Sequence, residues 1–118
     1  MKNILILLAF VSVISLLPTC TDSTPPPVQL KATISFSGTQ FVIVNNDRLD
    51  YRNATLEVNE KYDLKMPEIK AGETYTVGIM QFADKSGNRF SPMQKPQKFT
   101  IFCKLANGRE GFVSANWN

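Results

Sequence analysis

The sequence predicts an all-β protein whose folded part is an antiparallel β-sandwich of about seven strands. No window repeats its apolar residues with the 3.6-residue period of an amphipathic helix. Short apolar runs alternate with polar residues instead, and turn signals separate these runs about every 8–12 residues. One sheet of about seven strands would leave an apolar face uncovered, so we expect two packed sheets, with a small closed barrel as the alternative.

The first strands are bounded by short turn signals. The seven predicted strands cover residues 33–36, 40–44, 54–58, 62–66, 74–82, 99–105 and 111–117. Ser37-Gly38 separates the first two, and the second ends at Asn45-Asn46-Asp47, whose short side chains can hydrogen-bond their own backbone. The alternation of the third points Leu56 and Val58 inward. The fourth ends at Pro67.

The last strands show the clearest alternation. In the run 74–82, Tyr75, Val77 and Ile79 share one face, which we expect to point into the core. A turn at residues 84–88 follows, and two prolines exclude a central strand between residues 92 and 96. In the sixth strand the inward residues are predicted to be Phe99, Ile101, Cys103 and Leu105. Asn107-Gly108 is a strong hairpin signal that joins the last two strands.

The first 19 residues have the composition of an export signal. Lys2 supplies a positive charge, and residues 4–17 follow with 14 uncharged, mostly apolar residues. A membrane span needs about 20 such residues, whereas the apolar part of a signal peptide needs about 7–15. The length therefore favours a cleaved signal, and the 99 residues that remain of 118 are enough for one domain.

The end of this segment, Leu17-Pro18-Thr19-Cys20, resembles the bacterial lipoprotein signal. Leu17 and Cys20 match its pattern, whereas Pro18 and Thr19 replace the usual small residues, as the looser signals of Bacteroidota-type bacteria allow. The resemblance implies that Cys20 is lipidated and becomes the mature N-terminus. Thr21 in place of an aspartate implies the outer membrane of the cell envelope. The alternative is an ordinary thiol near an ordinary cleavage site.

The predicted organisation has three parts. A signal peptide occupies residues 1–19, the lipidated cysteine and a Pro-rich tether occupy residues 20–30, and the sandwich occupies residues 31–118. Within the tether, the segment Asp22–Pro27 has no apolar periodicity. Its three consecutive prolines favour an extended polyproline II conformation, which would space the domain from the bilayer.

Residues 41–47, 51–58 and 71–75 resemble the strands and turns of small bacterial lipoproteins with an immunoglobulin-like or fibronectin-III-like domain. The likeness extends over residues 41 to about 82 and rests on turn residues and alternation. It implies an immunoglobulin-like sandwich. The disulfide and the buried strand tryptophan of antibody domains are missing, so only the architecture carries over.

The composition argues against catalysis. The chain has no histidine, which excludes Ser-His-Asp and Cys-His mechanisms as well as histidine metal ligands. The nucleophile and phosphate-binding motifs Gly-x-Ser-x-Gly, Ser-x-x-Lys and Gly-x-Gly-x-x-Gly are absent. Cys103 has no histidine to activate it, and we interpret it as a small buried hydrophobe. We therefore expect no enzyme activity and no cofactor.

A metal site is also not expected. The turn at residues 84–88 faintly resembles a calcium loop, but no bidentate glutamate follows it. Asp47 and Asp50 could ligate a metal, yet their turn-forming role explains them more simply.

The charge distribution offers one candidate surface. The net charge is +3, and the segment from Lys85 to Arg109 holds six basic residues and no acidic one. The six residues are Lys85, Arg89, Lys95, Lys98, Lys104 and Arg109. A one-sided basic surface would suit anionic lipid headgroups or a polyanionic polysaccharide. Alternatively, these are solvated residues of turns and edges, where lysine also prevents edge-to-edge aggregation of sheets.

Three apolar residues, Met80, Phe82 and Phe102, fall on the face opposite the predicted inward residues. We expect them to be core residues, covered by the second sheet or by the loop 90–97. If they instead cluster in the open, they would mark a surface for a partner.

These observations predict a lipid-anchored, non-catalytic module of the cell envelope that binds an envelope protein or a polyanionic polysaccharide. Export and the lack of a recognised motif argue against nucleic acid. The alternative is a small-ligand or ion-binding exported domain whose site lies in the loops 45–53 and 84–97.

Overall fold

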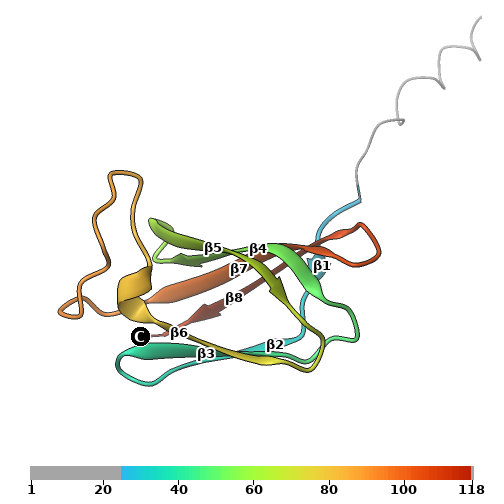
Figure 1. Ribbon diagram of the computed structural model, residues 1–118, viewed down its shortest axis with the longest axis horizontal. Coiled ribbons are helices and arrows are strands. Elements are labelled where there is room, and N and C mark those ends of the chain that lie inside the picture. The colour runs from blue at the N-terminus through green and yellow to red at the C-terminus, as the bar shows by residue number, and fades with distance from the viewer. Residues whose placement is uncertain (1–24, 118) are drawn as a thin grey trace, which may run out of the picture.

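The computed structural model describes residues 25–117, which form two packed β-sheets (Figure 1). The predicted signal peptide, Cys20 and the first part of the predicted tether lie outside the described residues. The elements are β1 (Val28–Gln29), β2 (Ala32–Phe36), β3 (Gln40–Asn45), β4 (Tyr51–Val58), β5 (Tyr62–Ile69), β6 (Thr74–Gly78), the short 3₁₀ turn η2 (Ile79–Gln81), β7 (Lys98–Leu105) and β8 (Glu110–Asn116). The strand order is β1-β8-β7-β4-β5 in one sheet and β2-β3-β6 in the other. The predicted all-β sandwich is confirmed, and neither sheet closes into a barrel.

Each of the seven predicted strands has a counterpart, but several bounds differ. β4 begins at Tyr51 and contains a bulge, where Asn53 adopts a positive φ of 50° and the pairing with β7 shifts register. β5 continues through Pro67 to Ile69 rather than ending there. It is the edge strand of its sheet, where a missing backbone N–H is tolerated.

The predicted strand 74–82 ends early, at Gly78, and this changes the direction of the residues that follow. The N–H of Ile79 donates to the carbonyl of Thr39 (2.9 Å), and η2 then turns the chain. The turn breaks the two-residue alternation. Phe82 therefore points into the core, although uninterrupted alternation would place it on the opposite face from Val77.

One strand was not predicted. β1 pairs in parallel with β8, with Val28 opposite Gly111 and Gln29 opposite Phe112. Leu30 follows it and is buried, with its N–H donating to the carbonyl of Phe112 (3.0 Å). The side chain of Leu30 lies where a Cβ on residue 111 would be, so glycine is needed there. The sandwich therefore begins at Val28, inside the predicted tether, rather than at Lys31.

The core lies between the sheets and is centred on aromatic rings. The ring of Phe41 is fully buried and contacts four others: Phe36, Phe82, Phe99 and Trp117, with centroids 4.8, 5.6, 4.6 and 6.0 Å away. Leu56, Val58 and Val77 are buried as the alternation predicts. The predicted inward residues of β7 are all buried as well.

The sandwich has two distinct ends (Figure 1). Tyr51 pairs with Leu105 at one end of β4, and Val58 pairs with Phe99 at the other. The turns 46–50, 70–73 and 106–109 lie at the first, together with residues 25–27, and we call it the hairpin end. The turns 37–39 and 59–61 and the long loop 82–97 lie at the second, which we call the loop end.

Candidate functional site

An aromatic pair, one ring exposed and the other half-buried, lies on the outer face of the five-stranded sheet. Phe102, in the middle of β7, is 44% exposed, and its neighbours Ile101 and Cys103 point into the core. Phe112 of β8 is its partner in the ladder, and their ring centroids are 5.3 Å apart. Thr55 of β4 lies opposite Phe102 on the other side. Such cross-strand aromatic pairs stabilise a sheet, and an exposed one also offers apolar contact area.

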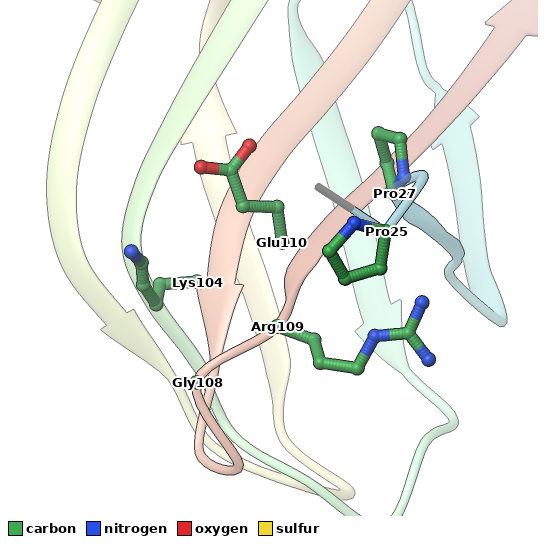
Figure 2. Close-up of a pocket in the computed structure, with 6 residues that line it drawn as sticks. All are labelled: Pro25, Pro27, Lys104, Gly108, Arg109 and Glu110. Atoms are coloured by element: carbon green, nitrogen blue, oxygen red, sulfur yellow. The ribbon is translucent and has the colours of Figure 1, made fainter. Parts of the chain in front are cut away.

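Two hollows adjoin on this face, and we call them together the outer groove. The smaller, of about 220 Å³, is lined by Asn53, Thr55, Phe102, Cys103, Lys104 and Glu110. The larger, of about 470 Å³, is lined by Pro25, Pro27, Lys104, Gly108, Arg109 and Glu110 (Figure 2). Lys104 and Glu110 belong to both, so the groove extends from the bulge of β4 across β7 and β8 to the N-terminal prolines.

The β7–β8 hairpin shapes the larger hollow. The predicted Asn107-Gly108 turn is confirmed: Gly108 has a φ of 89°, and its N–H donates to the carbonyl of Leu105 (2.8 Å). The Oδ1 atom of Asn107 accepts from the N–H of Arg109 (3.0 Å). The Arg109 side chain then donates from Nη2 to the carbonyl of Pro26 (3.0 Å), which holds the proline segment against the hairpin (Figure 2).

The six basic residues of the segment 85–109 do not form one surface. Lys98 and Lys104 lie near opposite ends of β7, about 20 Å apart at the rise of a strand. Lys85, Arg89 and Lys95 belong to the loop end, whereas Arg109 lies at the hairpin end. Some are already engaged: Lys98 pairs with Glu60 at 3.0 Å, and Arg89 donates to the carbonyl of Gln81 (3.2 Å). The continuous basic run in the sequence is therefore divided between the two ends.

The loops 45–53 and 84–97, predicted as one possible ligand site, also lie at opposite ends and cannot line a common pocket. In the loop 84–97, Asp84 Oδ1 accepts from the N–H groups of Asn88 (2.8 Å) and Ser86 (2.9 Å). The bond from Asn88 is the main reason that the pKa of Asp84 lies below its ordinary value. The carboxylate thus shapes the predicted turn. Within residues 25–117, no group of three cysteine or acidic side chains could hold a metal ion.

Met80, Phe82 and Phe102, which were predicted to share a face, lie in different environments. Phe82 is buried, as a core residue would be, but Met80 is 55% exposed and Phe102 is 44% exposed. The prediction of core is therefore wrong for these two. They do not cluster, because Met80 lies in η2 and Phe102 on the outer face of β7. The partner of Phe102 is Phe112, which the alternation within residues 111–117 could have placed on the same face.

Cys103 is buried, as predicted. Burial raises the pKa of its thiol to about 11, the charge of Asp47 adds to this effect, and a hydrogen bond with the Gly111 backbone opposes it. The thiol is therefore protonated at neutral pH, which suits an inert core residue. Burial, followed by the hydrogen bond to Asp47, also raises the pKa of the Tyr51 hydroxyl above its ordinary value.

The raised pKa of Cys103 predicts a loss of stability in alkali. Below pH 9.0, the ordinary thiol value, both states are protonated and the thiol contributes no pH dependence. Between pH 9 and pH 11 only the unfolded thiol ionises, so the free energy of unfolding should fall by about 2–3 kcal/mol. Urea titrations across this range should show that the free energy of unfolding falls less steeply with pH for Cys103→Ala than for the wild type. Identical slopes would contradict the prediction.

In the part of the chain that the structure describes, no helix combines the length and apolar character needed to cross a membrane. No family model matches the chain, and no curated protein or solved structure matches it at a significant level.

Proposed function

We propose that the protein is a lipid-anchored, non-catalytic binding module of the bacterial cell envelope. Cys20 carries the lipid, in the outer membrane, and the outer groove binds another envelope component. The observation that carries the binding role is the Phe102–Phe112 pair, in which Phe102 is exposed and Phe112 half-buried, next to the polar side chains of Asn53, Thr55, Lys104 and Glu110. Aromatic residues at the centre of a polar rim are typical of the energetic centre of an interface.

The chemistry of the outer groove favours a protein partner over a polyanionic polysaccharide. A polyanion would need several free cations in one place. Among the described residues that line the groove, two are basic, Lys104 and Arg109. Arg109 donates to the carbonyl of Pro26, and Glu110 lies between Lys104 and Arg109. The mixture of an apolar centre with both signs of charge matches a protein surface better.

The groove also argues for binding without catalysis. Glu110 is the one carboxylate among the described residues that line it, and this side chain is exposed. General acid–base chemistry usually needs a second group positioned against the first and shielded from water. A small-ligand site is less favoured. The hollow next to Phe102, at about 220 Å³, is smaller than typical ligand pockets of about 300–1,000 Å³, and the larger hollow, which is within this range, has no aromatic side chain among the described residues that line it.

We further propose that the sandwich is immunoglobulin-like. Counted in order from β2 to β8, its strands 1, 2 and 5 form one sheet, and strands 3, 4, 6 and 7 belong to the other. The immunoglobulin fold places strands 1, 2, 4 and 5 in one sheet and 3, 6 and 7 in the other. The two arrangements differ only in β5, which joins β4 as an edge strand.

The anchor is tested by Cys20→Ala. The wild-type protein, expressed with its own signal in a bacterium that makes lipoproteins, should incorporate a clickable fatty acid and fractionate with the outer membrane. Cys20→Ala should lose the label and the membrane association, because the thioether bond needs the thiol. The matched control is Cys103→Ala, which removes the other cysteine and should keep both. Label that persists in Cys20→Ala would refute lipidation at this residue.

The binding role is tested by capture from detergent-solubilised envelope. The wild-type protein should retain a specific envelope protein, and Phe102→Glu should reduce its recovery about tenfold or more, as expected for a central aromatic contact. Met80→Glu is the matched control, since Met80 is exposed but lies at the loop end, and it should bind as the wild type does. Equal recovery with both variants, or no captured protein, would count against the proposed face.

A further inference from the structure

The acidic side chains in the turns of the hairpin end accept hydrogen bonds from groups of that same end. Asp47 Oδ2 accepts from the N–H of Lys31 (2.8 Å) and from the hydroxyl of Tyr51 (2.5 Å). Asp50 Oδ1 accepts from the N–H of Ala71 (2.8 Å). Glu73 Oε1 accepts from the N–H of Lys70 (2.7 Å). All three carboxylates therefore serve to hold the turns together.

The basic side chains of the same end are exposed to solvent. They are those of Lys31, Arg48, Lys70 and Arg109. Arg109 donates to the carbonyl of Pro26, whereas the side chains of Lys31, Arg48 and Lys70 have no hydrogen-bond or ion-pair partner among residues 25–117. Glu110 is exposed at this end as well, but it lines the outer groove. The three cations without a partner can therefore meet an anionic surface.

The length of chain before the sandwich restricts which end can approach the anchor point. Four residues lie between Cys20 and Pro25, and the five residue-to-residue steps from Cys20 to Pro25 span at most about 18 Å when fully extended. Arg109 fixes the point of departure at the hairpin end by holding Pro26. The eight residues of β4 place the loop end about 26 Å further away. The hairpin end is therefore held within about 18 Å of a bilayer in which Cys20 is anchored, whereas the loop end can extend away from it.

From these observations we infer that the hairpin end is a docking surface for the bilayer itself, in which Lys31, Arg48 and Lys70 meet the phosphates of anionic lipid headgroups. The inference rests on the proposed anchoring at Cys20. In this arrangement the outer groove stands upright from the membrane, open to a partner from the side. The loop 82–97, with the exposed Met93, is the part furthest from the lipid.

The test uses the lipidated full-length product in vesicles that contain phosphatidylglycerol and a headgroup spin-labelled lipid. A fluorophore is attached to Ala106→Cys at the hairpin end or to Ser86→Cys at the loop end, both exposed turn positions. The fluorophore at residue 106 should be quenched at least about threefold more than that at residue 86. Reversing the charges with Arg48→Glu and Lys70→Glu should lower the quenching at residue 106 by about half. Lys85→Glu with Lys95→Glu, at the loop end, is the matched control and should leave it unchanged.

The outcomes separate this inference from the proposed function. If mass spectrometry finds the lipid on Cys20 but both fluorophores are quenched equally, the docking surface is wrong and the anchor stands. The same holds if charge reversal at residues 48 and 70 has no effect. If Cys20 carries no lipid, both the proposed anchor and the inference drawn from it are wrong.

Discussion

Phe41→Ala is expected to lower the free energy of unfolding by about 3–5 kcal/mol. The Phe41 ring is fully buried and contacts four other aromatic rings. Its removal therefore leaves a cavity between the two sheets. A domain of this size has a total stability of only about 5–15 kcal/mol. The variant should therefore be partly unfolded at moderate temperature, as urea titration followed by circular dichroism would report.

Phe102→Ala provides the matched comparison for Phe41→Ala. It removes the same side chain from a position that is 44% exposed and contacts one ring, that of Phe112. We expect a loss of about 1 kcal/mol, within the range of a cross-strand pair. Equal losses for the two variants would mean that the core is not organised around Phe41.

Asn45→Ala is expected to lower the free energy of unfolding by about 3 kcal/mol. The side chain is fully buried and makes three hydrogen bonds: Nδ2 donates to the carbonyls of Leu49 (3.0 Å) and Ile69 (3.1 Å), and Oδ1 accepts from the N–H of Asp47 (2.8 Å). Alanine would leave the buried carbonyl of Ile69 and the partly buried backbone groups of Leu49 and Asp47 without these partners. Hydrogen exchange at Asp47 and in the turn 70–73 should accelerate along with the loss of stability.

Asn45→Asp distinguishes hydrogen bonding from packing at this position. Aspartate has nearly the same shape, but an ionised carboxylate cannot donate to two carbonyls, and its burial is unfavourable. It should therefore destabilise at least as much as alanine. Asn46→Ala is the control, because Asn46 is exposed and its side chain makes one hydrogen bond, to Thr33. Wild-type stability in Asn45→Asp would show that the two bonds donated by Asn45 Nδ2 contribute little.

The strands could be predicted because their side chains alternate between core and solvent. Cys103 was placed correctly, since three neighbours of the same parity are apolar, and the Asn107-Gly108 turn was found from its two residues alone. Alternation placed Phe82 on the opposite face of the predicted strand from Val77, because η2 interrupts the strand. No residue type in that segment predicts a 3₁₀ turn. β1 was missed because a two-residue parallel strand is too short to show a period.

The candidate site was predictable only in part. Alternation placed Phe102 on the face opposite the core, but it cannot tell whether another layer covers that face, which depends on how the strands divide between sheets. The basic run from Lys85 to Arg109 is continuous in the sequence, yet β7 carries the chain from the loop end to the hairpin end within it. These basic residues are close in the sequence, but the fold places them at opposite ends of the sandwich.

The position of β1 determines how the sandwich responds to tension on its N-terminal segment. A pull on residues 25–27 acts along the axis of β1 and enters the five-stranded sheet through its parallel ladder with β8. Under such a shear load the bonds to β8 and that from Leu30 to Phe112 resist together, rather than opening one after another as in a peeled hairpin. The side chain of Leu30 packs against Gly111, and this contact must also break before β1 can move along β8. The fold thus gives mechanical resistance at the point where a membrane tether would apply force.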